Sequence, residues 1–370
     1  MPTRFLPLLC LAVLCITLSL GLWPFHAPHN QVTWLAKRNG LHFGRDSSVF
    51  SSRPFSPSAA NTTSGASIEI WLHPRLIWDS GTFLSFYRPA DRSVLSFRQF
   101  QTDLELKLQT NDDARHARKI HVDDVFRRGQ SPFLTITSGT QGTFVYLDGT
   151  VALTSPQPLF SAADLQARMI VCDAPRQPDS WRGELFGLAL YRTQLTANEV
   201  QQHYAAWTHF GRPQPAGSER NFALYLFSEH SGRIAQDRAN SGVDLYIPET
   251  YQVLDKIAMQ PFWTEFEMTR SYWGAALKNI VGFVPFGFSF YAWLATFLSS
   301  RRASWVTVLL GTAVSLTIEV LQAFLPTRDS GTTDIFTNTL GTWLGLVSYR
   351  LFVPWAEQVF PWISLSRKNT

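Results

Sequence analysis

Three apolar stretches in the last hundred residues constrain the fold of this chain more than any other feature of its sequence. They run from 280 to 298, from 305 to 324 and from 335 to 353. At about 1.5 Å per helical residue, each is long enough to cross a hydrocarbon core of roughly 30 Å. A fourth stretch, residues 5–23, contains no charged residue. These stretches predict an α-helical membrane domain, with four transmembrane helices in all.

Six polar residues lie at the ends of the last three stretches. Antiparallel threading of the helices brings them to the same face of the bilayer. They are Asn279, Glu319, Gln322, Arg328, Asp334 and Asn338. Burying carboxylates and amides near a membrane costs free energy, so ionisable residues there are candidate functional residues. We therefore predict a ligand-binding patch at this face, in which no pattern identifies a catalytic residue.

Small residues and a proline predict how these helices pack. Gly341 and Gly345 form the small-xxx-small pattern that lets two membrane helices approach closely. Pro285, with Gly287 close by, predicts a kink in the first of the three helices, because proline removes a helical hydrogen bond. The kink is expected to open room beside Asn279.

Basic residues predict the orientation of the helices. With four spans, Arg4, Arg301, Arg302 and Arg350 all fall on one side of the bilayer. By the positive-inside rule that side is the cytoplasm, so both termini are expected there and the polar patch is expected at the outer leaflet. Residues 1–23 are interpreted as an uncleaved anchor because their apolar core exceeds that of a usual signal peptide, with a cleaved signal as the alternative.

Between the first apolar stretch and the other three, short runs of alternating apolar and polar residues predict β-strands. Many short strands separated by turn residues predict an all-β sandwich. Asp148-Gly149 predicts a hairpin, because glycine tolerates positive φ. Thr196 and Glu199 predict a capping box at the start of a short helix. Residues 31–61 lack periodicity, as a tether or an irregular first strand does. The predicted strands are 68–72, 82–87, 93–97, 104–108, 133–137, 143–147, 169–172 and 183–191.

Three segments of this region share their order with a known fold. Residues 67–74, the hairpin 144–149 and residues 187–200 resemble the concanavalin A-like or laminin G-like jelly roll. The resemblance covers about residues 40–210 and implies a sandwich of a kind that binds glycans or proteins. A fold alone assigns no activity. Residues 224–248 resemble the opening strand of such a jelly roll, and we expect them to complete its sheets.

The polar residues of the membrane region also stand in a characteristic order. They occupy the segments 279–287, 318–322 and 338–341, with Arg328 and Asp334 between the last two. In this arrangement residues from about 272 to 355 resemble the VanZ family of bacterial membrane proteins. The resemblance implies a bacterial protein of the cell envelope, associated with resistance to teicoplanin and related glycopeptide antibiotics, and supplies no mechanism.

Composition argues against one class of partner. A formal net charge of +4, without a basic run, argues against nucleic-acid binding. No ligand spacing predicts a metal site, and no cofactor is expected. Calcium bound by Asp148 and Asp173 is the one arrangement considered for the jelly roll, although turn and surface roles are commoner for such residues.

The sequence thus predicts an ordered series of regions. The predicted fold class is an all-β jelly-roll sandwich, concanavalin A-like, joined to an α-helical membrane domain. The regions are an anchor (1–23), an extracytoplasmic laminin G-like sandwich with tether and trailing strand segment (24–250), an aromatic stalk (251–276), a VanZ-like three-helix domain (277–355) and a cytoplasmic tail (356–370).

Three functions fit these regions. The favoured one is a multi-pass protein of the bacterial cytoplasmic membrane whose outer patch binds a lipid-linked precursor or a glycopeptide, with a glycan-binding ectodomain. In it Arg328 contacts an anionic group, while Glu319 and Asp334 orient Arg328 or accept hydrogen bonds. The second is a membrane-embedded enzyme acting on a lipid-linked sugar or phosphate, with Glu319 or Asp334 as general base. The third is a lectin-like domain for which the helices are only an anchor.

Overall fold

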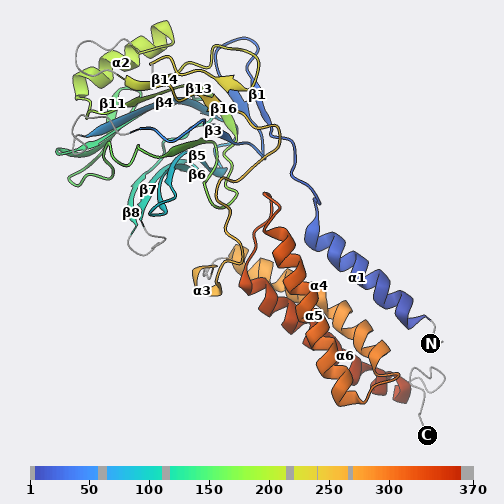
Figure 1. Ribbon diagram of the computed structural model, residues 1–370. Helices are drawn as coiled ribbons and strands as arrows, with labels where there is room; N and C mark the ends of the chain where they lie inside the picture. The colour runs from blue at the N-terminus through green and yellow to red at the C-terminus, as the bar shows by residue number, and fades with distance from the viewer. Residues whose placement is uncertain are drawn as a thin grey trace. The chain divides into compact units, whose positions relative to one another are not determined.

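The computed structural model describes residues 5–56, 65–110, 117–213, 221–239, 241–265 and 270–359. The chain divides into two compact units, a β-rich unit and a helical unit (Figure 1). The β-rich unit comprises residues 27–255. The helical unit combines residues 1–26 with residues 256–370, so the two ends of the chain belong to the same unit.

The β-rich unit contains two antiparallel sheets. The first has the order β1-β2-β13-β4-β9-β10-β11, and β14 pairs with β13 beyond the end of β2. Its strands are β1 (Val32–Trp34), β2 (Leu41–Phe43), β4 (Ala66–Pro74), β9 (Phe133–Gly139), β10 (Gly142–Leu147), β11 (Thr150–Ser155), β13 (Gly183–Tyr191) and β14 (Asn221–Tyr225).

The second sheet has the order β15-β16-β3-β12-β5-β6-β7-β8. Its strands are β3 (Val49–Ser51), β5 (Ser80–Arg88), β6 (Ser93–Phe100), β7 (Asp103–Gln109), β8 (Arg118–Val122), β12 (Arg168–Val171), β15 (Ile234–Ala235) and β16 (Leu245–Tyr246). Along β7 the side chains of Leu104, Leu106 and Leu108 are buried, and the residues between them are half-buried. This period of two packs one face of each sheet into a common core, and the predicted all-β sandwich is confirmed.

Two segments join the sheets although their sequences lack a clear strand pattern. Residues 32–51 form β1, β2 and β3, each three residues long, and supply strands to both sheets. Residues 221–246 do the same through β14, β15 and β16. Strands this short carry too few residues to show a period of two. Their pairing therefore depends on the neighbouring strands.

Helix α2 (Ala197–Phe210) begins at the predicted capping box. The Thr196 side chain accepts from the Glu199 amide, and the Glu199 side chain accepts from the Thr196 amide. Val200 and Trp207 pack with residues of the first sheet in a second apolar cluster. At Gly187 on β13, a Cβ atom would lie 2.3 Å from the Trp207 ring, so only glycine leaves room for the helix.

Within the part of the chain that the structure describes, the helical unit contains four long helices and one short one (Figure 1). They are α1 (Leu6–Leu22), α3 (Phe262–Glu265), α4 (Arg270–Leu294), α5 (Ser300–Gln322) and α6 (Thr332–Val359). Phe283, Phe286 and Phe290 of α4 pack with Cys10 of α1 and Ile318 of α5. Helix α1 is thus packed against the C-terminal helices.

Among the described residues, one helix, α5, is long and apolar enough to cross a membrane by its length and composition, and α1 is a shorter apolar helix. The three C-terminal helices overlap the three predicted apolar stretches. Helix α4 begins ten residues before the first predicted stretch at 280, and α6 continues six residues beyond the end of the third at 353. Arg4 and residues 360–370, which include most of the predicted tail, lie outside the described residues.

Candidate functional site

Two of the six predicted patch residues meet at the C-terminal end of α1. Gln322 Nε2 donates to the Gly21 carbonyl oxygen at 2.7 Å, and Arg328 Nη2 donates to the same oxygen at 3.0 Å. Arg328 also reaches the Leu20 carbonyl at 3.4 Å. The last carbonyls of a helix have no partner within the helix and carry its negative dipole end. An amide and a guanidinium therefore fasten the end of α1 to the end of α5.

Glu319 closes the loop between α5 and α6. Its side chain is buried, with 1% of the residue exposed, and Oε2 accepts from the Gly331 amide at 2.8 Å. The Ser330 hydroxyl donates to the Glu319 carbonyl at 2.8 Å. Groups of the loop thus contact Glu319 both at its side chain and at its carbonyl.

Asn338 lies deeper, between α5 and α6. Its Nδ2 donates to Ser315 Oγ at 2.9 Å, and Ser315 is one helical turn from Glu319 on the buried face of α5. Asn338 is 5% exposed, and its Oδ1 has no partner among the described residues. Asp334 stands in the first turn of α6, where the helix dipole favours a carboxylate. Asn279 is half-buried on α4.

Lys256 also belongs to this group, although no sequence pattern had singled it out. Its Nζ donates to the carbonyls of Gln322 and Leu325 at the end of α5. Burial lowers the pKa of Lys256 to about 8, against the charges of Asp329 and Glu319. The ammonium thus donates to backbone carbonyls at the end of α5, as the Arg328 guanidinium does at the end of α1. Lys256 and Gln322 are 66 residues apart, and no motif links them.

The glycines that were expected to pack the helices set the distance between α4 and α6. A Cβ at Gly341 would lie 2.2 Å from the Ile280 carbonyl oxygen, and one at Gly345 would lie 2.1 Å from that of Val284. From the first contact to the second, the contacting residues on both helices move four positions toward the C-terminus. Helices α4 and α6 therefore run parallel. At Gly287 a Cβ would lie 1.9 Å from a carbonyl of α6. These contacts leave no space for a side chain.

Pro285 lies inside α4 and is exposed. The Ser289 hydroxyl donates to the Pro285 carbonyl at 2.8 Å, and the buried Cys10 thiol of α1 donates to the Ser289 carbonyl at 3.3 Å. The proline cannot donate to the carbonyl one turn before it. The helix nevertheless continues on both sides of Pro285, from Arg270 to Leu294.

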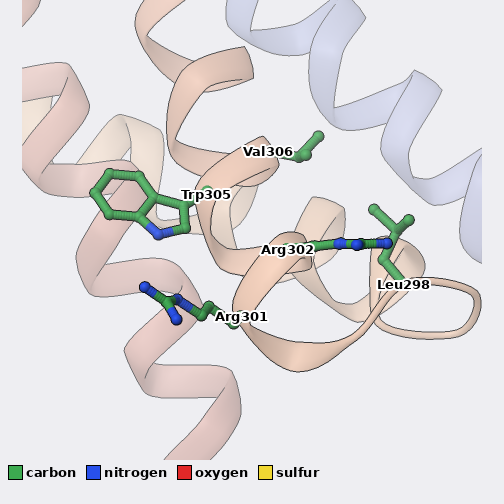
Figure 2. Close-up of a pocket in the computed structure, with 5 residues that line it drawn as sticks. All are labelled: Leu298, Arg301, Arg302, Trp305 and Val306. Atoms are coloured by element: carbon green, nitrogen blue, oxygen red, sulfur yellow. The ribbon is translucent and has the colours of Figure 1, made fainter.

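A cavity of about 520 Å³ lies at the opposite end of α5 from Gln322. Figure 2 shows Arg301 and Arg302 pointing to different sides of the helix, with Trp305 one turn further on. The cavity is lined by Leu298, Arg301, Arg302, Trp305 and Val306. The buried members of the predicted patch are instead enclosed by contacts within the helical unit.

The two aspartates considered for calcium have separate structural roles. Asp148 Oδ1 accepts from the Phe133 amide at 2.9 Å, in the predicted hairpin turn. Asp173 is fully buried and accepts from the Tyr251 hydroxyl at 2.7 Å and the Asp179 amide at 2.8 Å. Burial raises the pKa of Asp173 to about 7. Among the described residues, Asp148 and Asp173 do not belong to a common group of possible metal ligands.

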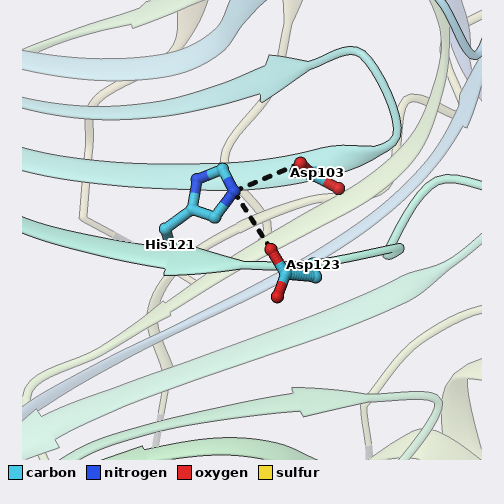
Figure 3. Close-up of side chains that lie close together, drawn as sticks. All are labelled: Asp103, His121 and Asp123. Carbon is cyan, nitrogen blue, oxygen red and sulfur yellow. Dashed lines mark hydrogen bonds and ion pairs between the residues drawn. The ribbon is translucent and has the colours of Figure 1, made fainter.

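A different cluster has ligand atoms that converge. Asp103, His121 and Asp123 place one ligand atom each within 4.8 Å of one another. His121 Nε2 lies 3.1 Å from Asp103 Oδ2 and 3.2 Å from Asp123 Oδ1 (Figure 3). The cluster lies where β7 begins and β8 ends, and its residue types are able to hold a divalent cation. Sequence reasoning missed it because the ligands come from two strands.

A buried carboxylate holds α2 on the first sheet. Glu69 of β4 has no exposed surface. It accepts from the Tyr191 hydroxyl at 2.7 Å and from Trp207 Nε1 at 2.9 Å, and its Oε1 lies 2.8 Å from His203 Nδ1. Burial of a carboxylate is tolerated when donors surround it. Three donors from two elements make Glu69 a structural connection.

The fold and the polar helix ends define a two-unit protein, a β-sandwich joined to a bundle of apolar helices. Residues 222–353 match the VanZ/LLP1 family, a family of membrane proteins. The chain therefore contains a VanZ-like region, as its polar residues indicated. The match begins 50 residues before the predicted start at 272 and takes in the last strands of the sandwich. No curated protein matches the chain.

Three solved structures are similar to parts of this chain. The receptor binding domain of botulinum neurotoxin D is 13% identical with a TM-score of 0.37, over 55% of this chain and 60% of that one. The SAP-like pentraxin from Limulus polyphemus is 15% identical with a TM-score of 0.35, over 61% and 95%. The CBM40 of a Ruminococcus gnavus sialidase, bound to α2,3-sialyllactose, is 13% identical with a TM-score of 0.37, over 44% and 95%.

Proposed function

We propose that this chain is a multi-pass protein of the bacterial cell envelope that binds a lipid-linked or glycopeptide-type ligand at the outer ends of its helices, while its sandwich binds glycan. The observation that carries the proposal is the shared Gly21 carbonyl, which joins Gln322 and Arg328 to the end of α1. It gathers the ends of α1 and α5 and the α5–α6 loop into one polar group. Ionisable residues at membrane helix ends are functional candidates.

The charge distribution supports the proposed threading of α1, α4, α5 and α6 through the bilayer. Arg301 and Arg302 begin α5, and Glu319 lies near its other end. Arginines beside the end of a span are typical of its cytoplasmic side, so this placement fits a cytoplasmic start of α5. Helix α4 has 25 residues and α6 has 28, which exceed the roughly 20 that a span needs.

Arg328 has donors left for a ligand. A guanidinium carries five N–H donors, and the described hydrogen bonds of Arg328 use only Nη2. Its side chain is half-buried, so part of it faces outward. Held in place by α1, the free edge of the guanidinium suits bidentate contact with a phosphate or carboxylate.

Replacement of Arg328 tests this proposal. In cells where deletion of the protein produces an envelope phenotype, Arg328→Ala is expected to reproduce it, while Arg328→Lys retains part of the function because a charge remains. Arg350→Ala is the matched control, since Arg350 is exposed and lies in the second half of α6. Full function of Arg328→Ala at normal abundance would reject the ligand role.

One observation favours a second candidate, in which the helices only anchor a lectin-like domain. Glu319, Gln322 and Asn338 are each at most 5% exposed and bond to other parts of the helical unit. Replacing all four helices with unrelated spans separates the candidates. The anchor candidate expects unchanged function, and the ligand-binding candidate expects its loss.

A further inference from the structure

The cavity at the start of α5 combines charged and apolar lining residues. Arg301 and Arg302 supply the charged groups, and apolar surface comes from the other lining residues, Leu298, Trp305 and Val306. Each arginine has one of the last two residues one helical turn further on, so the four helical residues form two neighbouring rows on one face of α5. Figure 2 shows the two guanidinium groups on different sides of this face. A group that occupies the cavity is therefore flanked by both arginines.

The opposite face of α5 is packed inside the helical unit. Ala303 and Thr307 have no exposed surface, and Ala303 packs with Tyr291 of α4 in an apolar cluster. The Tyr291 hydroxyl also lies 2.9 Å from Ser300 Oγ, at the first residue of α5. These contacts fix the rotation of α5 about its axis. The two arginines of the cavity, which are both exposed, therefore stay on its outer face.

Neither arginine of the cavity is neutralised by a described neighbour. Among the described residues, none forms a hydrogen bond or an ion pair with the side chain of Arg301 or Arg302. A guanidinium carries five N–H donors and no acceptor. Within the described part of the chain, these donors are left for a ligand or for water.

The acidic residues of the helical unit leave this end positive. Residues 280–318 contain the two arginines and no acidic residue. Residues 335–370 contain one acidic residue, Glu357, against Arg350, Arg367 and Lys368. The Glu357 side chain lies outside the described residues, but the two segments are net positive even with its charge counted. The other acidic residues of the unit lie within 265–267 and 319–334, next to the start of α4 and the end of α5. The charge around the cavity therefore favours an anion.

Exposed apolar side chains continue from the cavity along α5. Trp305 is 64% exposed, Leu309 is 63% exposed and Leu316 is 43% exposed. Their offsets of 0, 4 and 11 place them in one stripe along the helix. A soluble anion would use the arginines and leave this stripe bare. A ligand with an anionic head and an apolar tail matches both parts.

We propose that this face of α5 binds an anionic phospholipid of the cytoplasmic leaflet. The phosphate lies between Arg301 and Arg302, which donate to its oxygens, and one acyl chain follows the stripe. Basic pockets at the cytoplasmic side of membrane helices suit such head groups, and tryptophan suits the boundary between head groups and hydrocarbon. The inference rests on the proposed threading of α5 through the bilayer. It concerns the opposite end of α5 from Arg328.

The test measures lipid binding to the full-length protein in detergent by native mass spectrometry. Dioleoyl phosphatidylglycerol is the anionic probe, and dioleoyl phosphatidylethanolamine, with the same acyl chains, is the zwitterionic one. Phosphatidylglycerol is expected to bind at least about tenfold more tightly, because a hydrogen bond to a charged group contributes about 1.5–3 kcal/mol. Equal binding of the two lipids would overturn the proposal. The ligand role of Arg328 would be unaffected, since its test measures envelope function.

Single substitutions locate the site. Arg301→Gln and Arg302→Gln are each expected to weaken phosphatidylglycerol binding about tenfold, through loss of a charged donor, and to leave phosphatidylethanolamine binding nearly unchanged. Arg350→Gln is the matched control, because Arg350 is exposed on α6 and does not line the cavity. It should change the affinity by less than about twofold, since salt screens a charge outside the cavity. An equal loss in all three variants would mean that net charge attracts the lipid, and would overturn the proposed site.

A soluble phosphate ester is the competing occupant of the cavity. Glycerophosphoglycerol, the head group of phosphatidylglycerol without its acyl chains, is added at the same concentration as the lipid. It is expected to leave the bound lipid in place, because it has no acyl chain to cover the stripe. Displacement of the lipid at equal concentration would make the cavity a site for soluble anions and would refute the assignment to a phospholipid.

Discussion

Removing the carboxylate of Glu69 should release α2 from the sandwich. In Glu69→Leu, three buried donors lose their acceptor, from Tyr191, His203 and Trp207. Each lost acceptor costs about 1–3 kcal/mol when the donor stays buried. Because the three bonds share one carboxylate, their effects are not additive, and a hydrogen bond to a charged group contributes about 1.5–3 kcal/mol. We take about 3 kcal/mol as the lower bound of the free energy lost in Glu69→Leu.

Amide hydrogen exchange of α2 measures this loss locally in the full-length protein. A decrease of about 3 kcal/mol in the free energy of opening corresponds to roughly a hundredfold faster exchange, at about 1.4 kcal/mol per factor of ten. Residues 197–210 should show this change, and β7 on the other sheet should change far less. Leucine is chosen because it keeps much of the volume of the glutamate side chain.

Glu184→Leu is the control for Glu69→Leu. Glu184 lies on the neighbouring strand β13, and its partly exposed side chain pairs with Arg38. Partly exposed pairs contribute about 0–1 kcal/mol, so exchange of α2 should change by less than about fivefold. If Glu69→Leu exchanges as slowly as the unaltered protein, the three hydrogen bonds do not hold α2, and the apolar contacts of Trp207 alone suffice.

Three further predictions follow from the same structure. First, burial raises the pKa of Asp173 from 3.8 to about 7, so its contribution to stability is complete below about pH 4 and is lost as the pH rises through 7. The loss of stability is about 4 kcal/mol at most, at 1.36 kcal/mol per pKa unit. Asp173→Asn should therefore flatten the pH dependence of thermal unfolding, and an unchanged pH dependence would contradict this prediction. Second, Gly345→Ala forces a methyl against the Val284 carbonyl and should destabilise the helical unit by about 1–3 kcal/mol. The control Gly282→Ala meets nothing within 4 Å and should be neutral or slightly stabilising. Equal melting temperatures of the two variants in detergent would argue against close packing of α4 and α6. Third, Thr196→Ala removes the cap of α2 and should cost about 1 kcal/mol, measured as about fivefold faster exchange of its first turn, and an unaltered rate would mean that the cap is dispensable.

The strands of the sandwich could be predicted from the sequence wherever a strand is long enough to show its period of two. Residues 104–108 alternate, and β7 forms there. Glu69 shows the limit of the same reasoning. It occupies a polar position between Ile68 and Ile70 on β4, a pattern that ordinarily indicates solvent, yet α2 covers it completely. His203 of α2 is buried against it, 134 residues further along the chain.

In the helical unit, the sequence identified residues by type and could not identify their partners. Gln322 and Arg328 were recognised as polar groups at helix ends, and they do meet. Their common partner is the carbonyl of Gly21, about 300 residues away. Asn338 was also recognised, but it bonds to Ser315 rather than to these residues.

By itself, the sequence determined the features that depend on neighbouring residues: the period of two in the longer strands, the turn at Asp148-Gly149, the cap at Thr196 and the apolar stretches with small residues between helices. The tertiary structure decided which backbone atoms receive the charged side chains, as at Lys256 on the end of α5. Every residue type offers the same carbonyl oxygen, so no pattern of letters marks the one that a distant cation will bind.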